Sequence, residues 1–295
     1  MGTSDGTARA VADFVDGIGN LPTPPEVFSQ IVKAVDNPYS SAYSVAKLMS
    51  EDPGMSASVL RVTNSAFYSL ATPVTSVKQA VVVIGLDAVK SLVVSASIVD
   101  MFKGDQVGRD FQDTFWRHSL AAAFGARTLL RSIRPTDIAA CERAFTGGLL
   151  HDIGKMALYL HNPAAYQAVA KQAQAGIEQE LEAERKAFGF DHAQVGCALT
   201  LKWNLPEDLS LAIGHHHDPL TLQEGHLLVD VLHVADALSY HLLADGGEDF
   251  AAPAIKPGVF DRSGLKLENV GQHLEALKTE YLNAETFLSL VHGDA

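Results

Sequence analysis

Residues 50–68, Ser-Glu-Asp-Pro-Gly-Met-Ser-Ala-Ser-Val-Leu-Arg-Val-Thr-Asn-Ser-Ala-Phe-Tyr, contain the turn signal Asp52-Pro53-Gly54 followed by a stretch of helical character. Proline is excluded from helix interiors, so one helix should end before this tripeptide and another should follow it. A similar turn signal, also containing proline, recurs at Ala71-Thr72-Pro73. Helices are therefore predicted at about 43–51, 55–65, 76–84 and 87–102. The two-residue alternation of a strand is absent over any useful length, which predicts an all-α fold.

The rest of the chain follows the same helical pattern. Pro24-Pro25 suits the first turn of a helix, and Asp191 with Gln194 three residues later is a capping-box pattern. The polar stretch 103–109 is interpreted as a boundary between two halves. Further helices are predicted at about 24–35, 111–133, 137–154, 163–175 and 178–188, then from 191, and at about 206–217, 225–244, 267–280 and 284–292. Residues 1–20 are expected to be a polar segment with a short helical piece, and 245–266 a loop.

The composition limits the partners and the compartment. The 295 residues have a formal net charge of −13, and an acidic chain repels phosphate backbones, so nucleic acid is not expected as a partner. Two scattered cysteines, Cys141 and Cys197, suit free thiols in a reducing cytoplasm. The first residues lack the pattern of a signal peptide, and no apolar stretch is long enough to cross a bilayer. A cytoplasmic protein with no membrane partner is expected.

Imidazole and carboxylate side chains occur at positions that suit a metal site. His151 is followed directly by Asp152, and His216 by His217. Asp236 lies in an apolar helix, where a buried charge is costly unless it is paired, hydrogen-bonded or bound to a metal. The candidate ligands are His118, His151, Asp152, His192, His216, His217 and Asp236. Nitrogen and oxygen ligands of this kind suit iron, manganese or zinc, and two such ions can share one bridging carboxylate.

Ordinary structural roles compete with this interpretation. A single histidine in a helical protein is more often packed or solvated than a ligand, and one His-Asp dipeptide is weak evidence. A packed or solvated role is expected for His161, His215, His226, His233, His241, His273 and His292. A metal-free His–Asp network, hydrogen-bonded within the core, is the alternative for the candidate ligands as well.

The first half of the chain resembles an HDOD domain, the HD-related output domain. The residues that resemble it are Leu21-Pro22-Thr23-Pro24-Pro25, Ile31, 50–57, 60–68, Thr75-Ser76-Val77-Lys78-Gln79-Ala80 and Ile84-Gly85-Leu86. The second half resembles the helical core that HD domains share with the HD-GYP phosphodiesterases. Together the two resemblances cover about residues 20–245.

The resemblance implies an all-α fold in which an N-terminal helical subdomain packs on an HD-type helical core. It divides the chain into the polar segment 1–20, an HDOD domain over 21–245 with halves at about 21–103 and 110–245, and a final segment 246–295 of loop and helices. It also implies that the seven candidate ligands form a complete two-metal set, with Asp152 in the bridging place. Lys155 matches a lysine that faces the substrate phosphate. Thr114 replaces the glutamate of trinuclear members, and the Gly-Tyr-Pro loop is absent, so cyclic dinucleotide recognition is not supported.

Two functions follow from the resemblance. The first is a bacterial signal-transduction output module that binds a divalent metal and relays a signal to a protein partner or a phosphate-containing small ligand. The second is a metal-dependent phosphohydrolase or phosphodiesterase, in which Asp152 and Lys155 would be the catalytic residues. Most HDOD domains lack the HD ligands and act as output modules, so the output role is favoured. The oligomeric state and the upstream signal are left open.

Overall fold

The computed structural model describes residues 3–19, 21, 30–31, 33–34, 42–50, 52–65, 68, 70–102, 107–173, 176–244 and 253–282. Its helices are α1 (Thr3–Gly17), α3 (Ala42–Ser50), α4 (Pro53–Thr63), α5 (Val77–Ile84), α6 (Leu86–Met101), α7 (Arg109–Ile133), α8 (Ile138–Leu150), α9 (Ile153–His161), α10 (Pro163–Ala173), α11 (Ile177–Phe188), α12 (His192–Lys202), α13 (Glu207–His215), η1 (Pro219–Thr221), α14 (Leu227–Ala244), α15 (Gly258–Ser263), η2 (Leu267–Asn269) and α16 (Val270–Tyr281). No strand occurs among these residues, so the predicted all-α class is confirmed.

Some predicted features lie outside the described residues. They are most of the helix at 24–35, the centre of the polar break at 103–106, the first part of the loop at 245–252 and the last helix at 284–292. The domain boundaries stay predictions.

The turn signals of the first half act as helix caps. The Asp52 carboxylate accepts a hydrogen bond from the backbone N–H of Met55 at 3.0 Å, with Pro53 in the first turn of α4. At the other end of α4, the Asn64 side chain makes two hydrogen bonds with the backbone of Val74, of 2.7 and 2.6 Å. This amide therefore fixes the segment that leads into α5.

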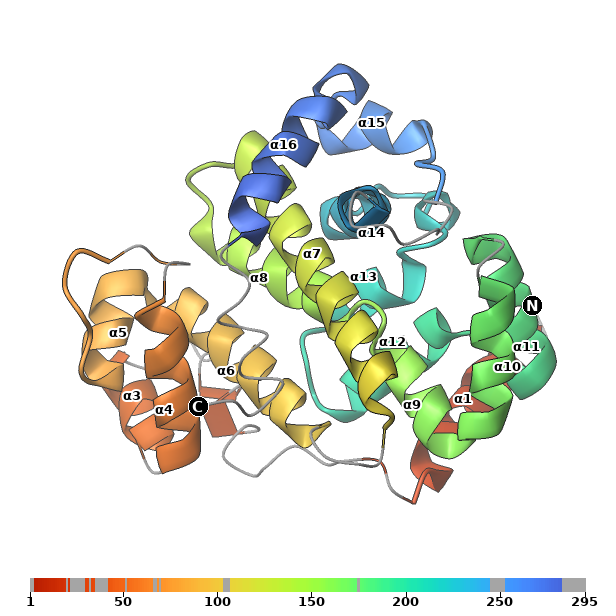
Figure 1. Ribbon diagram of the computed structural model, residues 1–295, viewed down its shortest axis with the longest axis horizontal. Helices are drawn as coiled ribbons and strands as arrows, with labels where there is room; N and C mark the ends of the chain where they lie inside the picture. Colours follow the sequence, from red (N-terminus) through yellow and green to blue (C-terminus); the bar gives the residue numbers. More distant parts are fainter. Residues whose placement is uncertain are drawn as a thin grey trace.

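The helices of the two halves meet through α6 and α8 (Figure 1). In Figure 1, α3, α4 and α5 lie on one side of the molecule, and α7 runs through its centre, where it packs against α8, α14 and α16. Ser91 of α6 makes a 2.7 Å hydrogen bond with Thr146 of α8. Among the described helices, the α6–α8 pair thus joins the N-terminal helices to the core.

A helix break at His151-Asp152 differs from the prediction of one helix over 137–154. The Nδ1 atom of His151 lies 2.7 Å from the carbonyl oxygen of Gly148, so the side chain satisfies an acceptor that a continuing helix would pair with a backbone N–H. The carbonyl of Asp152 then accepts the N–H of Lys155 at 2.8 Å, and α9 begins. The break places both side chains at a helix junction in the core.

Two glycines next to this junction allow backbones to approach closely. A Cβ atom at Gly148 would lie 2.5 Å from the carbonyl oxygen of Ala122 and from the Cα of Ala123, both on α7. A Cβ atom at Gly154 would lie 2.0 Å from the carbonyl oxygen of His192, at the start of α12. Any larger residue would therefore push α7 or α12 away from the junction.

The N-terminal helix α1 is longer than the predicted short piece and packs on α12, far along the chain. Val11 and Val15 are buried, and the ring of Phe14 lies 4.7 Å from that of Phe190. The ammonium of Lys202 donates to the carbonyl of Val15 at 3.2 Å. A second difference is α15, a short helix within the stretch predicted as loop.

Candidate metal centre

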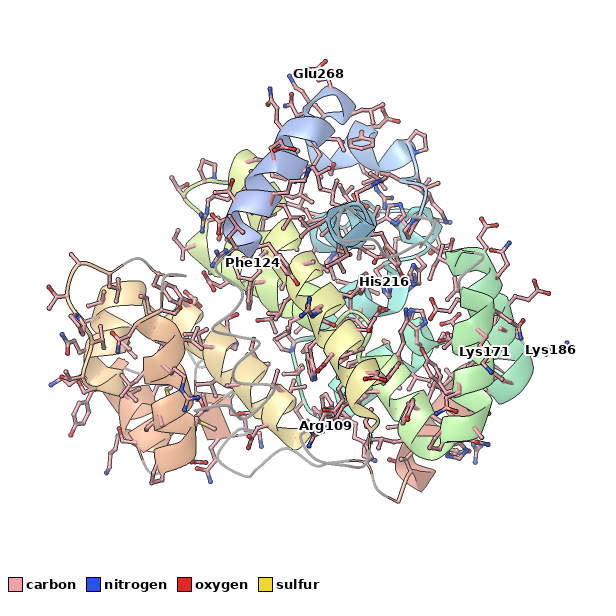
Figure 2. All side chains as sticks on the ribbon, in the orientation of Figure 1. Arg109, Phe124, Lys171, Lys186, His216 and Glu268 are labelled. Atoms are coloured by element: carbon pink, nitrogen blue, oxygen red, sulfur yellow. The ribbon has the colours of Figure 1, made fainter. Side chains whose placement is uncertain are left out.

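The structure brings all seven predicted ligands together in the interior. They come from separate elements: α7 for His118, the α8–α9 junction for His151 and Asp152, the first residue of α12 for His192, the end of α13 for His216 and His217, and α14 for Asp236. Figure 2 shows His216 near the centre of the view, whereas Lys186 and Glu268 lie at the outline of the molecule. Six of the seven are buried, and His217 is partly buried.

Four side chains form the first of two groups. The Nε2 atom of His118 lies 3.1 Å from Nε2 of His151 and 3.1 Å from Oδ1 of Asp236. Oδ2 of Asp152 lies 3.4 Å from Nε2 of His118 and 3.5 Å from Nε2 of His151. Two imidazole nitrogens and two carboxylate oxygens thus face a common point.

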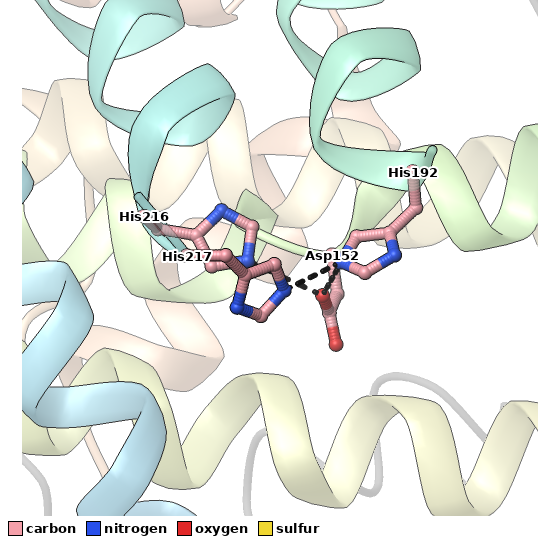
Figure 3. Close-up of side chains that lie close together, drawn as sticks. All are labelled: Asp152, His192, His216 and His217. Atoms are coloured by element: carbon pink, nitrogen blue, oxygen red, sulfur yellow. Dashed lines mark hydrogen bonds and ion pairs between the residues drawn. The ribbon is translucent and has the colours of Figure 1, made fainter. Parts of the chain in front are cut away.

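The second group, drawn in Figure 3, consists of His192, His216 and His217 around Asp152. The Oδ1 atom of Asp152 is 3.1 Å from Nε2 of His192 and 3.8 Å from Nε2 of His216. Nε2 of His217 is 2.9 Å from Nε2 of His192. Ligand atoms of all four residues lie within 4.8 Å of one another. The carboxylate of Asp152 therefore presents one oxygen to each group.

Outer hydrogen bonds set the tautomers of the histidines. Nδ1 of His151 faces the carbonyl of Gly148, and Nδ1 of His216 faces that of Ile213 at 2.6 Å, so each Nδ1 must be the protonated nitrogen. The hydroxyl of Ser239 donates to the carbonyl of Asp236 and so accepts from Nδ1 of His118 at 3.0 Å. In their neutral forms these rings direct an Nε2 lone pair into the cluster, as metal-binding histidines do.

Burial and charge move the pKa values of the cluster in different directions. Burial, and then the neighbouring His151, lower the pKa of His216 to about 3. Burial also opposes protonation of His192, but the Glu184 carboxylate outweighs it and raises the pKa of His192 to about 10. Burial acts against ionisation of Asp152, yet His151 and Lys155 hold its pKa well below the usual value. The carboxylate is therefore charged, and the cations around it are what make that charge tolerable in the core.

The donor set fits divalent metal ions. Oδ1 of Asp152 and Nε2 of His216 are buried and have no hydrogen-bond partner within the described part of the chain. Buried polar atoms without partners are costly, and the paired Nε2 lone pairs repel one another unless a cation lies between them. Mixed imidazole and carboxylate ligands suit iron, manganese or zinc. The alternative to metal binding is a hydrogen-bonded His–Asp network without metal, in which protonated His192 supplies the positive charge.

Sequence reasoning missed two buried glutamates on α11. Glu184 is fully buried, and its Oε2 accepts both the backbone N–H and the Nδ1–H of His192. Glu180 accepts a hydrogen bond from the ammonium of Lys155 through Oε2 at 3.2 Å, while the same ammonium lies 3.0 Å from Oδ2 of Asp152. The charged sequence of α11 looks like a solvated helix, so nothing in it marked these two residues.

A cavity of about 1000 Å³ adjoins the second group. It lies between α1, α11, α12 and the end of α13, and His217 and the free thiol of Cys197 are among its lining residues. Its walls are mainly apolar, and its charged groups are paired, Arg185 with Asp191 and Lys202 with Asp16. A small molecule in this cavity would touch a predicted ligand. Among the described helices, none has the length and apolar character needed to span a membrane.

Comparisons with known proteins agree with this architecture. A family model for the HDOD domain matches residues 21–219. The chain is similar to an uncharacterized protein of Treponema pallidum (strain Nichols), with 25% identity over 213 residues, which are 72% of this chain and 40% of that protein. The chain thus spans about two fifths of the length of this curated relative.

Three solved structures share the fold. One, from Shewanella amazonensis SB2B, is provisionally named a phosphohydrolase; it has a TM-score of 0.75 and 23% identity, over 96% of this chain and 98% of the other. An HDOD domain protein with unknown function from Geobacter sulfurreducens has a TM-score of 0.70 and 24% identity, covering 98% and 97%. A protein from Marinobacter aquaeolei VT8, provisionally named for signal transduction, has a TM-score of 0.69 and 24% identity, covering 92% and 60%. At these identities the likeness concerns the fold alone.

Proposed function

The chain belongs to the HDOD domain family, and on this premise we propose that it is a bacterial regulatory output module whose His/Asp cluster binds two divalent metal ions. The observation that supports the proposal best is the carboxylate of Asp152. Each of its oxygens faces a separate group of histidines, an arrangement that a purely structural hydrogen-bond network does not require.

The two positions would be served by different side chains. His118, His151 and Asp236 would hold one ion, and His192, His216 and His217 the other. Asp152 would be shared between them. Ions of this kind supply positive charge and Lewis acidity to a bound phosphate. The chain's own contribution is to orient the five rings and to exclude water from them.

The family and the name of the Marinobacter aquaeolei protein with the same fold support the proposed output role. We propose that the chain acts in the cytoplasm, where it relays a signal through a protein partner or a phosphate-containing small ligand. The cavity beside His217 offers space for such a ligand next to a metal position.

Elemental analysis of the untagged protein, purified without chelators, tests the metal proposal. The expected result is about two equivalents of iron, manganese or zinc in the wild type and almost none in Asp152→Asn, which keeps the shape of the side chain. His241→Asn removes an exposed histidine of α14 and should retain both equivalents. A folded wild type that binds no metal, even after incubation with each ion, would reduce the cluster to a hydrogen-bonded network and overturn the proposal.

A second function, hydrolysis of a phosphoester, is favoured by one observation. Lys155 is buried beside Asp152 and Glu180, so a cation is held next to the proposed ions. Burial opposes its charge, but Asp152 and then Glu180 outweigh burial and raise the pKa of Lys155 well above its usual value. A permanent ammonium is suited to neutralising the charge that a phosphate gains in the transition state.

Turnover assays distinguish the second function from the first. The metal-loaded protein would be incubated with p-nitrophenyl phosphate, its bis-ester and a panel of nucleotides. Metal-dependent turnover that is lost in Asp152→Asn would establish a phosphohydrolase. Two bound ions without turnover on any of these compounds would leave the regulatory role.

A further inference from the structure

The loop that bears His216 and His217 is held by a part of the chain that follows the family match. The match ends at residue 219, whereas residues 253–265, which include α15, fold back over the loop 216–222. Arg262 of α15 donates from Nη2 to the carbonyl of Pro219 at 2.6 Å and from Nη1 to that of Leu222 at 3.1 Å. The guanidinium thus satisfies two carbonyls of the loop that follows the histidine pair.

The guanidinium is itself fixed by a buried carboxylate. Asp230 of α14 is 1% exposed and accepts from Nε of Arg262 at 2.9 Å and from Nη2 at 2.6 Å. A bidentate pair of this kind is geometrically rigid. Gly225 makes room for it, because a Cβ atom there would lie 3.0 Å from Cδ of Arg262. Arg262 therefore joins α14, α15 and the ligand loop at one point.

A second connection reaches His216 through another histidine. The backbone N–H of Lys256 donates to Nε2 of His233 at 3.0 Å, so Nδ1 of His233 must be the protonated nitrogen. That Nδ1 donates to the carbonyl of His216 at 2.8 Å. The side chain of Lys256 also pairs with Asp218, which follows His217. The hydrogen bonds of His233 thus connect residues 253–256 to the backbone of the predicted ligand His216.

The first group of ligands has no direct hydrogen bond of this kind within the described part of the chain. His118, His151 and Asp236 lie on α7, on the α8–α9 junction and on α14, and no described hydrogen bond joins them to residues 253–265. The two metal positions should therefore respond differently when this segment is displaced.

We infer that residues 253–265 are a clamp that sets the affinity of the second metal position, His192, His216 and His217, while the first position is independent of it. This inference rests on the proposed metal site and concerns its regulation. A partner or ligand that displaced the clamp would release one ion and leave the other. The occupancy of the second position would then report whether the clamp is in place. Arg262 acts here as a positioning residue.

The test compares metal content and release in wild type, Arg262→Met and Lys256→Met. Protein loaded with zinc is mixed with a chromophoric chelator, and the release of each equivalent is followed. Release of one equivalent should become about 10–100-fold faster in Arg262→Met, by analogy with the loss of metal affinity that follows when hydrogen bonds supporting a ligand are removed. The other equivalent should be released at the wild-type rate. Arg262→Lys keeps the charge but loses the bidentate geometry. Its release rate should therefore lie between those of wild type and Arg262→Met.

Arg127→Met is the matched control. Arg127 is buried and donates to Glu280 at 2.7 Å, so its loss loosens α16 without touching the ligand loop. It should leave both release rates unchanged. The clamp is overturned if Arg262→Met keeps wild-type release, if it loses both ions together, or if Arg127→Met has the same effect. If Arg262→Met does not fold, Arg262→Lys, which keeps a cation beside the buried Asp230, decides by the same criteria. A wild type that binds no metal refutes the proposed function instead.

Discussion

Glu184 accepts two hydrogen bonds from His192 through a single oxygen, from the backbone N–H at 2.8 Å and from Nδ1 at 2.7 Å. Both residues are fully buried. The glutamate fixes the ring plane and the tautomer of His192. Its charge also raises the basicity of Nε2, so this nitrogen becomes a stronger metal ligand. An acidic residue that sequence analysis assigned to no site thus determines how one predicted ligand is presented.

Replacing this carboxylate should weaken one metal position. In Glu184→Gln the amide keeps the volume but loses the charge, so the affinity of the second ion should fall about 10–100-fold. Calorimetric titration of the metal-free protein with zinc measures this change. Glu182→Gln, at an exposed position of the same helix, should behave as wild type. An unchanged affinity in Glu184→Gln would mean that His192 is not a ligand.

Close packing at Gly148 should make this residue intolerant of a methyl group. In Gly148→Ala the new Cβ would lie 2.5 Å from the backbone of Ala122 and Ala123, so α7 and α8 must separate. We expect a loss of about 1–3 kcal/mol in the free energy of unfolding, measured by chemical denaturation. Gly271→Ala in α16, where a Cβ would meet nothing within 4 Å, should instead gain about 0.5–1 kcal/mol. Equal effects of the two substitutions would contradict the close approach.

Lys155 should affect phosphate binding rather than metal binding. In Lys155→Met, two ions should remain, because the ammonium is not a ligand and its removal makes the site more negative. The affinity of the metal-loaded protein for inorganic phosphate should fall by about 1.5–3 kcal/mol, which is roughly 10–100-fold. Lys171→Met on the exposed face of α10 should change neither quantity. Unaltered phosphate affinity in Lys155→Met would remove the main support for hydrolysis.

Glu142 should make stability depend on pH. This carboxyl is buried in α8, and its Oε2 accepts no hydrogen bond from the described residues. Burial raises the pKa of Glu142 above its ordinary value of 4.5, although Arg127 and Arg131 partly oppose this. The folded protein therefore holds this proton more tightly than the unfolded chain, and stability falls as the pH rises from about 4.5 through the folded pKa.

Glu142→Gln removes that dependence. Its melting temperature relative to wild type should increase between pH 4 and pH 7, because only the wild type must ionise a buried carboxyl. Glu224→Gln, at an exposed position, should show no such trend. A constant difference between Glu142→Gln and wild type across this range would refute the assignment.

Local signals in the sequence predicted most of the fold. Asp52, Asp191 and the helical spacing of apolar residues marked the helices well, and the capping box of Asp191 and Gln194 is present. The break at His151-Asp152 was not predicted, because it depends on the side chain of His151 bonding to Gly148. Docking of α1 on α12 was also missed, since it rests on contacts between residues far apart in the sequence.

The candidate site shows the same division. All seven predicted ligands converge, although metal binding by them is still a prediction. They could be found because imidazoles and carboxylates in apolar helices need an explanation. Glu180 and Glu184 could not, because their burial depends on where α11 packs. The contacts of Arg262 could not be predicted for a similar reason, because its partners are Asp230 and two backbone carbonyls that only the folded chain brings to it.

Docking of α1 has a consequence for biosynthesis. Lys202 donates to the carbonyl of Val15 across 187 residues, and Phe14 packs on Phe190. At ribosomal rates of about 5–20 residues per second, α1 must wait roughly 10–40 s for α12 to be made. During that interval Val11, Phe14 and Val15 are an uncovered apolar stripe, a segment that a chaperone can bind. Completion of the helical core is therefore also the step that covers this apolar stripe of the nascent chain.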